Sequence, residues 1–512
     1  MDSDFDPRWE NVDVNILVAT SEVVPFSKTG GLADVCGTLP RELARLGHQV
    51  AVVAPAYRQS IECGQSNKSL HVDLDITIGQ KQVRGGILRS QLPESDVPVY
   101  LIEQDDYYDR PQLYRDGNDD YKDNCERFIF FCRSVLELVR LLELDVDVLH
   151  CNDWQTGLIP AYLKTEYADT PGFDSMASVM TIHNMAYQGQ FWHWDMLLTG
   201  LDWKYFNWNQ MEFFGKLNLL KTGLVFSDAI NTVSPRYALE IQSAPMGCGL
   251  EGVLAHRSNL VRGILNGADY SVWDPAIDSH IALNYTSDNW YAGKQACKQD
   301  LGQATGLPVS PEIPLVGVVG RLVEQKGVDL IGEVLKKRLT DSHVQWVILG
   351  RGDQKYQDMF LRLAAAYPEK LSVRLEFSDL LAHQIEAAAD LFLMPSKYEP
   401  CGLNQIYSLK YGTVPLVRET GGLADTIVDT NEKTLAAGTA NGFSFQSYQV
   451  EKLDQALERA LQTYARKEDW SRVVLTGMKQ DWSWTRSAKE YVWLYQESSA
   501  RVQQTVHSES LT

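Results

Sequence analysis

The sequence predicts an α/β protein of two domains, each built around a mainly parallel sheet. Apolar runs of strand length alternate with helix-like segments along both halves of the 512-residue chain, which is the pattern of parallel-sheet proteins. The hexapeptide Thr-Gly-Gly-Leu-Ala-Asp also occurs twice, at Thr29–Asp34 and at Thr420–Asp425. Each copy follows a strand-like run and precedes a helix-like one, and a helix N-terminus attracts anions. Two such turns predict two domains that face one anionic ligand.

The first domain opens with a strand–helix–strand unit. The runs Asn15–Thr20 and Gln49–Pro55 are predicted strands, and Leu39–Leu46 between them has helical spacing, with Gly47 as its C-cap. Alternating residues over 71–99 predict a hairpin-like insertion, the Tyr-, Asp- and Gly-rich stretch 107–121 predicts a surface loop, and 126–142 predicts an amphipathic helix. Further strands are predicted at Val146–His150, Ser178–His183, Ala229–Val233 and Val261–Asn266.

The strand pattern restarts in the second half of the chain. Strands are predicted at Pro314–Gly320, Gln345–Gly350, Ser372–Phe377, Asp390–Pro395 and Thr413–Val417. We place the first domain at residues 1–263 and the second at 264–481, because a glycine-rich strand end near 262–268 precedes a long irregular stretch. The aromatic helix predicted at 482–500 packs back on the first domain, and the polar tail 501–512 is expected to fray.

Composition narrows the class of protein. A net charge of −20 argues against non-specific binding to nucleic acid or to an anionic membrane. The acidic N-terminus lacks the apolar core of a signal peptide, and no apolar stretch reaches the length of a membrane span. The eight cysteines include no C-x-x-C pair, which fits free thiols in a reducing compartment. We therefore expect a cytoplasmic protein.

Cationic side chains at strand ends suit a phosphate-bearing ligand. Lys28 directly precedes the first glycine turn, from which an ammonium group reaches a phosphate, although most loop lysines are simply solvated. Arg321 and Lys326 follow a predicted strand and lie between glycines, where they suit a departing pyrophosphate. The alternative for this pair is an exposed charge cluster with a neighbouring glutamate.

Three further polar side chains stand at predicted strand ends. His183 suits a catalytic or sugar-binding group, although a buried, hydrogen-bonded histidine is the more common finding. Asp153 is either a site residue or the N-cap of the segment that starts at Trp154. Glu399 lies in a short loop flanked by apolar residues, where a carboxylate stabilises a cationic sugar transition state.

An aromatic stretch and an acidic pair are two further candidates for ligand binding. Aromatic residues crowd the stretch 187–208 and suit stacking on sugar rings, although such clusters are more often core, so we assign them to core and acceptor surface without dividing them. The acidic pair Asp145 and Asp147 begins a predicted strand, so we discount it as a metal site and expect no metal.

The motifs together closely resemble bacterial glycogen synthases and plant starch synthases of glycosyltransferase family 5, over about residues 15–495. The motifs that carry the resemblance are Lys28–Asp34, His183–Phe191, Gly263–Tyr270, Gly320–Gly327, Pro395–Leu403 and Thr420–Asp425. The resemblance implies the GT-B fold, in which two Rossmann-like domains with parallel sheets face a deep cleft. It also implies a retaining transferase that adds glucose from ADP-glucose to the non-reducing end of an α-1,4-glucan, without a metal or other cofactor.

The resemblance also assigns site residues. By it, His183, Glu399, Arg321, Lys326 and Asp153 form the catalytic set, with His183 beside the transferred glucose and Arg321 and Lys326 on the leaving diphosphate. The predicted substrate-binding residues are Lys28, Gly30, Gly31, Asp34, Tyr108, Asn184, Asn266, Phe377, Cys401, Gly402, Leu403, Thr420, Gly421 and Gly422. Among these, the backbone of 401–403 is expected to bind glucose hydroxyls and Thr420–Gly422 the distal phosphate.

The chain departs from the wider superfamily at one position. Relatives often carry a second glutamate eight residues after the first, where this chain has Tyr407. Glu399 is then the only acidic candidate in the loop, and retention is expected by same-face attack assisted by the departing phosphate. Phe377 is a candidate to stack on adenine, and a core phenylalanine is about equally expected.

Other functions and another glucose donor are alternatives to this interpretation. The full motif set argues against a sucrose-forming transferase or a sugar-nucleotide epimerase, and no feature identifies the pyridoxal phosphate lysine of a glucan phosphorylase. A catalytically silent glucan-binding protein is a further alternative, but it would not require the full set of Lys28, His183, Arg321, Lys326 and Glu399. UDP-glucose in place of ADP-glucose stays open because both donors present the same diphosphate charge.

Overall fold

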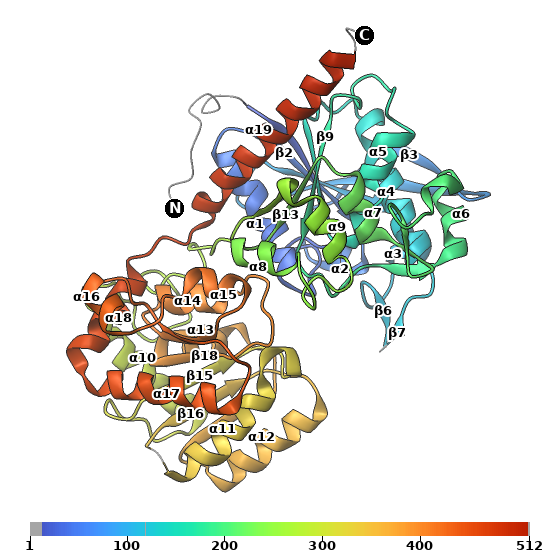
Figure 1. Ribbon diagram of the computed structural model, residues 1–512. Coiled ribbons are helices and arrows are strands. Elements are labelled where there is room, and N and C mark those ends of the chain that lie inside the picture. The colour runs from blue at the N-terminus through green and yellow to red at the C-terminus, as the bar shows by residue number, and fades with distance from the viewer. Residues whose placement is uncertain (1–12, 118, 342, 510–512) are drawn as a thin grey trace. The chain divides into compact units, whose positions relative to one another are not determined.

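The computed structural model describes residues 13–117, 119–341 and 343–509, which form two compact units (Figure 1). Unit 1 holds the chain up to Val233, the segment Ala238–Ile264 and the chain from Trp484 onward, and unit 2 holds Ser234–Tyr237 and Leu265–Ser483. The division after Ile264 falls beside the boundary predicted from the sequence. The short excursion of residues 234–237 into unit 2 has no counterpart in the prediction.

Unit 1 is built on a nine-stranded sheet that is parallel except at one edge. The strand order is β14-β13-β9-β8-β1-β2-β5-β4-β3, and only β4 pairs antiparallel, with both β3 and β5. These strands are β1 (Asn15–Ala19), β2 (Gln49–Pro55), β3 (Lys68–Ile78), β4 (Lys81–Gln91), β5 (Pro98–Glu103), β8 (Val148–Asn152), β9 (Ala177–Ile182), β13 (Ala229–Thr232) and β14 (Val261–Gly263). The predicted hairpin is therefore confirmed as β3 and β4, which widen the sheet.

Helices and small strands complete unit 1. The helices are α1 (Gly31–Arg45), α2 (Arg58–Glu62), α3 (Asp105–Tyr108), α4 (Asn124–Leu141), α5 (Ile159–Thr165), α6 (Met196–Thr199), α7 (Leu219–Phe226), α8 (Pro235–Glu240, which straddles the unit boundary), α9 (Glu251–His256) and α19 (Trp484–Glu509). The small strands are β6 (Arg115–Asp116), β7 (Asp119–Asp120), β10 (Gln190–Trp192), β11 (Glu212–Phe213) and β12 (Lys216–Asn218). Helix α1 begins at the first glycine turn, as the sequence predicts.

Unit 2 has a six-stranded parallel sheet in the order β17-β16-β15-β18-β19-β20. Its strands are β15 (Leu315–Val319), β16 (Gln345–Leu349), β17 (Leu371–Arg374), β18 (Leu391–Met394), β19 (Val414–Arg418) and β20 (Phe443–Phe445). Its helices are α10 (Trp290–Thr305), α11 (Val328–Asp341), α12 (Gln354–Ala366), α13 (Asp379–Ala388), α14 (Asn404–Lys410), α15 (Gly421–Thr426), α16 (Glu432–Ala437), α17 (Val450–Ala465) and α18 (Lys467–Met478). The second glycine turn starts α15, so both copies of the hexapeptide open a helix.

The stretch 107–121 is only in part the surface loop that its composition predicts, since residues 109, 111, 112, 115–117, 119 and 120 are exposed but Tyr107, Tyr108 and Leu113 are buried. Arg127, on α4, is fully buried beneath it and donates hydrogen bonds to the carbonyl oxygens of Tyr107 (2.8 Å) and Leu113 (2.9 Å). A buried guanidinium needs acceptors, and this stretch supplies them. The segment is therefore anchored to the core at Tyr107 and Leu113, and Tyr108 is fully buried.

The C-terminal helix α19 packs on α1 and β9 of unit 1 (Figure 1). Trp484, Tyr491 and Leu494 contribute to the same hydrophobic core as the sheet. Tyr491 accepts a 3.0 Å hydrogen bond from the Asn231 amide, and the Tyr495 hydroxyl lies 2.9 Å from Nδ1 of the buried His150. The tail expected to fray from residue 501 is instead helical through Glu509, and 510–512 lie outside the described residues. No helix of the described chain is long and apolar enough to cross a membrane.

We predict that Leu494→Ala lowers the free energy of unfolding by about 2–5 kcal/mol, because it removes a buried side chain and leaves a cavity between α19 and the sheet. Urea-induced unfolding measures this. Lys489→Ala, on an exposed position of the same helix, is the matched control and should change the value by less than about 0.5 kcal/mol. Equal effects of the two substitutions would contradict the packing of α19 on unit 1.

Candidate active site

In unit 1, the predicted site residues lie where the strand order reverses. Strands β1 and β8 are neighbours, and from this pair the chain extends the sheet through β2 on one side and through β9 on the other. Loops after the carboxyl ends of parallel strands diverge at such a point and leave room for a ligand. The loops that follow β1, β8 and β9 carry Lys28, Gly30, Asp153, His183 and Asn184, and the first turn of α1 carries Gly31 and Asp34.

The first glycine turn is held by a carboxylate that the sequence analysis missed. Glu22 is nearly fully buried, and its Oε2 accepts the backbone N–H groups of Thr29 (2.5 Å) and Gly30 (3.2 Å). The hydroxyl groups of Thr29 and Tyr114 donate to its Oε1 at 2.6 and 2.8 Å. An internal anion thus takes the first two amides of the turn, so part of the predicted anion site is already filled. The one sign of this role in the sequence is that Glu22 lies in the short loop between the first strand and the glycine turn.

Beyond Glu22, the turn is open. Lys28, Gly30 and Gly31 are exposed, and a Cβ atom added at either glycine would meet no atom within 4 Å. The Lys28 ammonium lies 2.7 Å from the Asp34 carboxylate, and both side chains are partly exposed. Asp34 therefore holds Lys28 at the mouth of the turn, and a surface pair of this kind is weak enough to exchange for a phosphate.

Asp153 positions His183. The Oδ1 atom of Asp153 accepts the backbone N–H of His183 at 2.8 Å. Asp153 is also the N-cap residue of the segment at Trp154 by position, but its side chain forms no cap bond there. Asp153 also has a φ of 57° with an extended ψ of −177°, a conformation that costs free energy for a residue with a Cβ atom. The strained turn after β8 and the turn after β9 are thus locked together.

The His183 ring is held in one tautomer. The Asn152 amide nitrogen donates to the carbonyl oxygens of Ala19 (3.1 Å) and His150 (3.3 Å), so its Oδ1 faces His183 Nε2 at 2.9 Å. That oxygen accepts the Nε2 proton, which leaves Nδ1 as an unprotonated acceptor. Burial lowers the pKa of His183 below its usual 6.5, so the ring is neutral at pH 7.

Burial acts on Asp153 in the opposite sense. Burial raises the pKa of the Asp153 carboxyl to about 7. The charge on Glu22 also raises it, whereas the hydrogen bond from the His183 backbone lowers it. A carboxyl with this pKa beside a neutral histidine is the kind of perturbed pair found at functional sites. Asn184 follows directly, and its Oδ1 accepts the backbone N–H of Ala186 at 3.0 Å.

Tyr108 does not join this group. Its side chain is fully buried, and its hydroxyl donates to the Arg127 carbonyl oxygen at 2.9 Å. The prediction that Tyr108 contacts substrate is therefore wrong for the structure described, and the residue has a core role beside Arg127.

The aromatic stretch divides in favour of the surface. Tyr187, Trp192, Trp194, Trp203 and Trp208 are all exposed, with Trp208 at 76%. Trp194 and Trp203 lie with ring centroids 5.6 Å apart. The core assignment is therefore wrong for these five residues, and a binding surface formed by them stays a prediction.

In unit 2 the site residues again follow the strands around a reversal of order. Strands β15 and β18 are neighbours, and the chain extends the sheet from β15 through β16 and β17, and from β18 through β19 and β20. The loops after β15 and β18 are bonded to each other, because the backbone N–H of Lys397 donates to the Gln325 carbonyl oxygen (2.8 Å) and the Gln325 amide donates to that of Tyr398 (3.1 Å).

Glu399 lies at the centre of these loops. It is 6% exposed, and its Oε2 accepts hydrogen bonds from Lys326 Nζ (2.6 Å) and Ser396 Oγ (3.0 Å). Arg321 is exposed, and its guanidinium lies 3.3 Å from the Gln325 side chain. The structure thus pairs Lys326 with a buried carboxylate, which contradicts a purely solvated cluster for this lysine. Arg321 is exposed, and its place in the site stays a prediction.

The second glycine turn packs against the Glu399 loop. Gly421 has a φ of +45°, and a Cβ atom there would lie 1.9 Å from the Glu399 carbonyl oxygen. A Cβ atom at Gly422 would lie 2.2 Å from the Cys401 carbonyl oxygen, and the Gly422 N–H donates to the Pro400 carbonyl oxygen at 3.1 Å. Both glycines are therefore required by close backbone approach, and Thr420 is the N-cap residue of α15.

The rest of the Glu399 loop presents backbone. Burial raises the pKa of the Cys401 thiol to about 12, so the thiol is not a nucleophile. Gly402 has a φ of +72°, and Leu403 is the N-cap residue of α14. Asn266 is buried, and its Oδ1 has no hydrogen-bond partner among the described residues. An unpaired buried oxygen of this kind suits a ligand hydroxyl.

Phe377 stands apart from the loops around Glu399. It follows β17, which ends at Arg374, and its side chain is 90% exposed. The core alternative is therefore wrong, and stacking on adenine stays a prediction.

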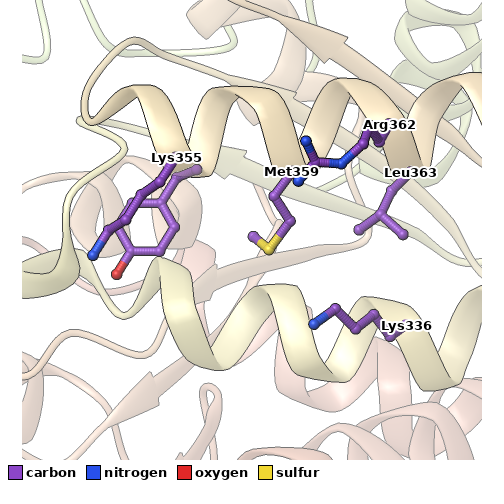
Figure 2. Close-up of a pocket in the computed structure, with 6 residues that line it drawn as sticks. Lys336, Lys355, Met359, Arg362 and Leu363 are labelled. Carbon is purple, nitrogen blue, oxygen red and sulfur yellow. The ribbon is translucent and has the colours of Figure 1, made fainter.

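A separate cavity of about 350 Å³ lies between α11 and α12 (Figure 2). It is lined by Lys336, Lys355, Tyr356, Met359, Arg362 and Leu363, none of which is a predicted site residue. Lys336 pairs with Glu333 at 2.6 Å, so part of its charge is already neutralised. We assign no function to this cavity.

Comparison with known proteins agrees with this geometry. Residues 15–256 match the starch synthase catalytic domain, and residues 307–473 match glycosyl transferases group 1. Glycogen synthase of Rhodopirellula baltica is 45% identical, over 94% of this chain and 97% of its own length, and glycogen synthase of Koribacter versatilis is 46% identical, over 95% and 98%.

Solved structures give the same result. The catalytic domain of starch synthase IV from Arabidopsis thaliana, bound to ADP and acarbose, matches with a TM-score of 0.86 and 32% identity, over 96% of this chain and all of that one. Sucrose-phosphate synthase from Thermosynechococcus elongatus shares the fold, with a TM-score of 0.57 and 15% identity.

Two parallel-sheet units with polar loops at their switch points define a glycosyltransferase of the GT-B class. Within that class, the chain belongs to the family of bacterial glycogen synthases and plant starch synthases.

We predict opposite effects of Asp153 and His183 on the pH dependence of stability. Between pH 3.8 and about 7 the folded Asp153 holds a proton that the unfolded chain has lost, so this group lowers stability as pH rises. Between about pH 3 and 6.5 the unfolded His183 holds the extra proton, so this group raises stability as pH rises.

Between pH 4 and 6.5, Asp153→Asn should therefore steepen the rise of the free energy of unfolding with pH, and His183→Gln should flatten it. Each change should approach about 1.4 kcal/mol per pH unit. Urea unfolding at several pH values measures the slopes, with the exposed His256→Gln as control. Changes of the same sign in both variants would contradict the assigned protonation states.

Proposed function

We propose that the protein transfers glucose from ADP-glucose to the non-reducing end of an α-1,4-glucan, with retention of configuration. As a member of its family, the chain is a glucosyltransferase that elongates glucan. The observation that carries the finer proposal is the buried Glu399 carboxylate, which is bonded to Lys326 and lies in a loop packed against a glycine turn that opens a helix. This arrangement offers cations to a departing diphosphate and a carboxylate to a cationic sugar.

The diphosphate end of the donor is assigned to Arg321, Lys326 and the turn Thr420–Gly422. Lys326 is paired with Glu399 at 2.6 Å and is partly exposed, so an arriving phosphate competes with the carboxylate for the same ammonium. As the glycosidic bond breaks, negative charge grows on the phosphate and draws Lys326 toward it. The same step frees Glu399 to face the positive charge that grows on the sugar.

Retention proceeds without a second carboxylate from this loop. Tyr407, at the position of the second glutamate of the wider superfamily, has its ring stacked on Trp273 with centroids 4.2 Å apart and planes 2° apart. We propose that the acceptor hydroxyl attacks the same face from which the diphosphate leaves, and that a phosphate oxygen takes its proton. The chain's own cations supply the charge for this step, so no metal is required.

Unit 1 contributes positioning and acceptor contacts. Lys28 at the open glycine turn is assigned to a donor phosphate, and the neutral His183 with its backbone carbonyl to the transferred glucose. The exposed aromatic residues of 187–208 suit the flat apolar faces of successive glucose rings. The starch synthase IV structure holds ADP and acarbose, which supports a nucleotide and a glucan as ligands here.

We predict that the purified protein incorporates labelled glucose into glycogen from ADP-glucose, without added metal and in the presence of a chelator. The product should be released by an α-1,4-specific hydrolase. UDP-glucose is tested in parallel. Incorporation only from UDP-glucose would overturn the donor and keep the reaction, and glycogen binding without incorporation from either donor would favour a catalytically silent glucan-binding protein.

We predict that Glu399→Gln lowers kcat roughly 10²–10³-fold, because the sugar cation loses its carboxylate. Its Kd for ADP should stay equal or tighten, since Lys326 is freed for the phosphate. Arg321→Ala should instead raise the Kd for ADP about 10–100-fold and lower kcat as well. Glu324→Gln, which breaks an exposed pair with Lys397, is the matched control. Unchanged turnover in Glu399→Gln would refute the assignment of Glu399.

A further inference from the structure

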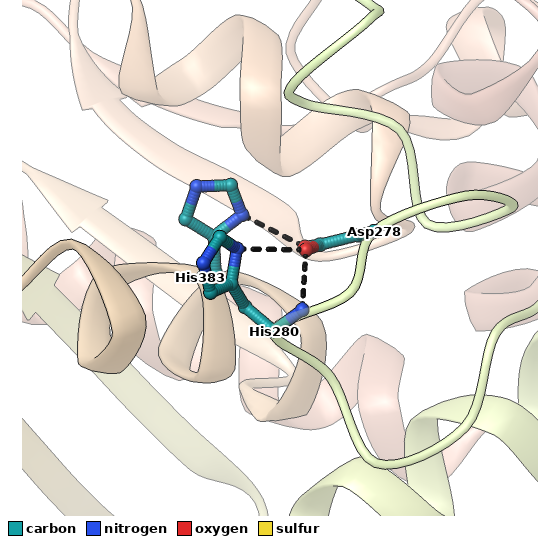
Figure 3. A group of neighbouring side chains, drawn as sticks. All are labelled: Asp278, His280 and His383. Atoms are coloured by element: carbon teal, nitrogen blue, oxygen red, sulfur yellow. Dashed lines mark hydrogen bonds and ion pairs between the residues drawn. The ribbon is translucent and has the colours of Figure 1, made fainter.

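Unit 2 holds a second convergent group of side chains, outside the loops around Glu399. Asp278 and His280 come from the irregular segment before α10, and His383 comes from α13 (Figure 3). Asp278 and His383 are 4% and 2% exposed, whereas the His280 side chain is 45% exposed. The group is therefore buried at one end and open to solvent at the other.

The three side chains direct their ligand atoms to one point. Asp278 Oδ2 lies 2.8 Å from His383 Nδ1, and Asp278 Oδ1 lies 3.2 Å from His280 Nδ1. One ligand atom from each residue lies within 4.8 Å of the other two. Ligands around a zinc ion at bond lengths of about 2.0–2.2 Å stand roughly 3–3.5 Å apart, so little movement is needed for all three to bind one ion.

The ligand set selects a class of ion. Two imidazoles and one carboxylate are a set used for zinc with one open position, and imidazole ligands favour zinc, copper, nickel and iron over magnesium or calcium. Because His280 is the exposed member, its side of the group gives access to solvent. A water molecule at the fourth position of a tetrahedral ion fits that side.

The surroundings hold the buried ligands in place. The His383 ring stacks on Trp273, with centroids 3.7 Å apart and planes 10° apart. Asp278 Oδ2 accepts the Tyr411 hydroxyl at 2.6 Å, and its Oδ1 accepts the His280 backbone N–H at 2.8 Å. The Asp278 carbonyl oxygen accepts the Asn284 amide at 2.8 Å. Outer partners of this kind orient metal ligands and raise affinity.

We propose that Asp278, His280 and His383 bind one divalent transition-metal ion of the zinc class, in addition to the transferase site. Binding requires an unprotonated Nδ1 on both histidines. For His383, the proton that faces Asp278 moves to Nε2, and the ion takes its place between Nδ1 and the carboxylate. Asp278 keeps its bonds to Tyr411 and to the His280 backbone, because a carboxylate has acceptor sites to spare.

The ion would join two parts of unit 2 that are distant in the sequence. It links the segment that follows Asn266 to helix α13, beside the stack of His383, Trp273 and Tyr407. A ligand that binds only the folded state stabilises it by mass action, and a link that closes a long loop adds to this. The ion is thus assigned a structural role, separate from glucosyl transfer.

The test uses the full chain, freed of metal with a chelator. Calorimetric titration with Zn²⁺ should show one tight site, and Co²⁺ at the same site should give the visible absorption of a four-coordinate ion. Zinc should raise the midpoint of thermal unfolding by roughly 5 °C at a hundredfold excess over Kd. Mg²⁺ should produce neither effect.

Variants decide whether these residues hold the ion. His280→Ala removes the exposed ligand with little risk to folding and should weaken zinc binding at least about 100-fold. His343→Ala, at another exposed histidine of unit 2, is the matched control and should leave binding unchanged. His280→Gln should behave as His280→Ala does. The proposal is overturned if zinc binds His280→Ala as tightly as the unsubstituted chain, or if the unsubstituted chain binds no Co²⁺ in a four-coordinate site.

Discussion

In each unit, the grouping of the predicted site residues depends on parallel strand pairing. In a parallel sheet every strand ends at the same edge, so residues from distant parts of the sequence meet in the loops beyond that edge. The neighbours β1, β8 and β9 gather the predicted site residues of unit 1, and β15, β18 and β19 gather those of unit 2. Hydrogen bonds then fix the positions of these residues. In unit 1 the Asp153 carboxylate accepts the backbone N–H of His183, and in unit 2 the Lys326 ammonium donates to Glu399.

The buried carboxyl groups of the two units have different kinds of partner. In unit 1 a buried carboxylate, Glu22, binds backbone amides, and Asp153 is pushed by burial toward its neutral form. In unit 2 the buried Glu399 is paired with the ammonium group of Lys326.

The sequence predicted what depends on local pattern and failed where long-range packing decides. Strands such as Gln49–Pro55 and the two helix-opening glycine turns follow from apolar runs and glycine placement. Tyr108 was misplaced because nothing near it in the sequence shows that Arg127 lies beneath its segment. Glu22 was missed because its partners become visible only when the loop folds back on itself. The exposure of Phe377 likewise depends on where β17 ends in space.

The two copies of the hexapeptide have the same sequence but should differ in which substitutions they tolerate. At Gly30 and Gly31 the space around each missing side chain is empty, whereas at Gly421 and Gly422 it is filled by the backbone of the neighbouring loop. Even the final aspartates differ, since Asp34 pairs with a lysine side chain and Asp425 accepts the backbone N–H of Arg236. Among related sequences, Gly421 and Gly422 should therefore be nearly invariant, because a side chain there would collide with backbone. Gly30 and Gly31 should vary more, unless a bound ligand requires glycine at these positions.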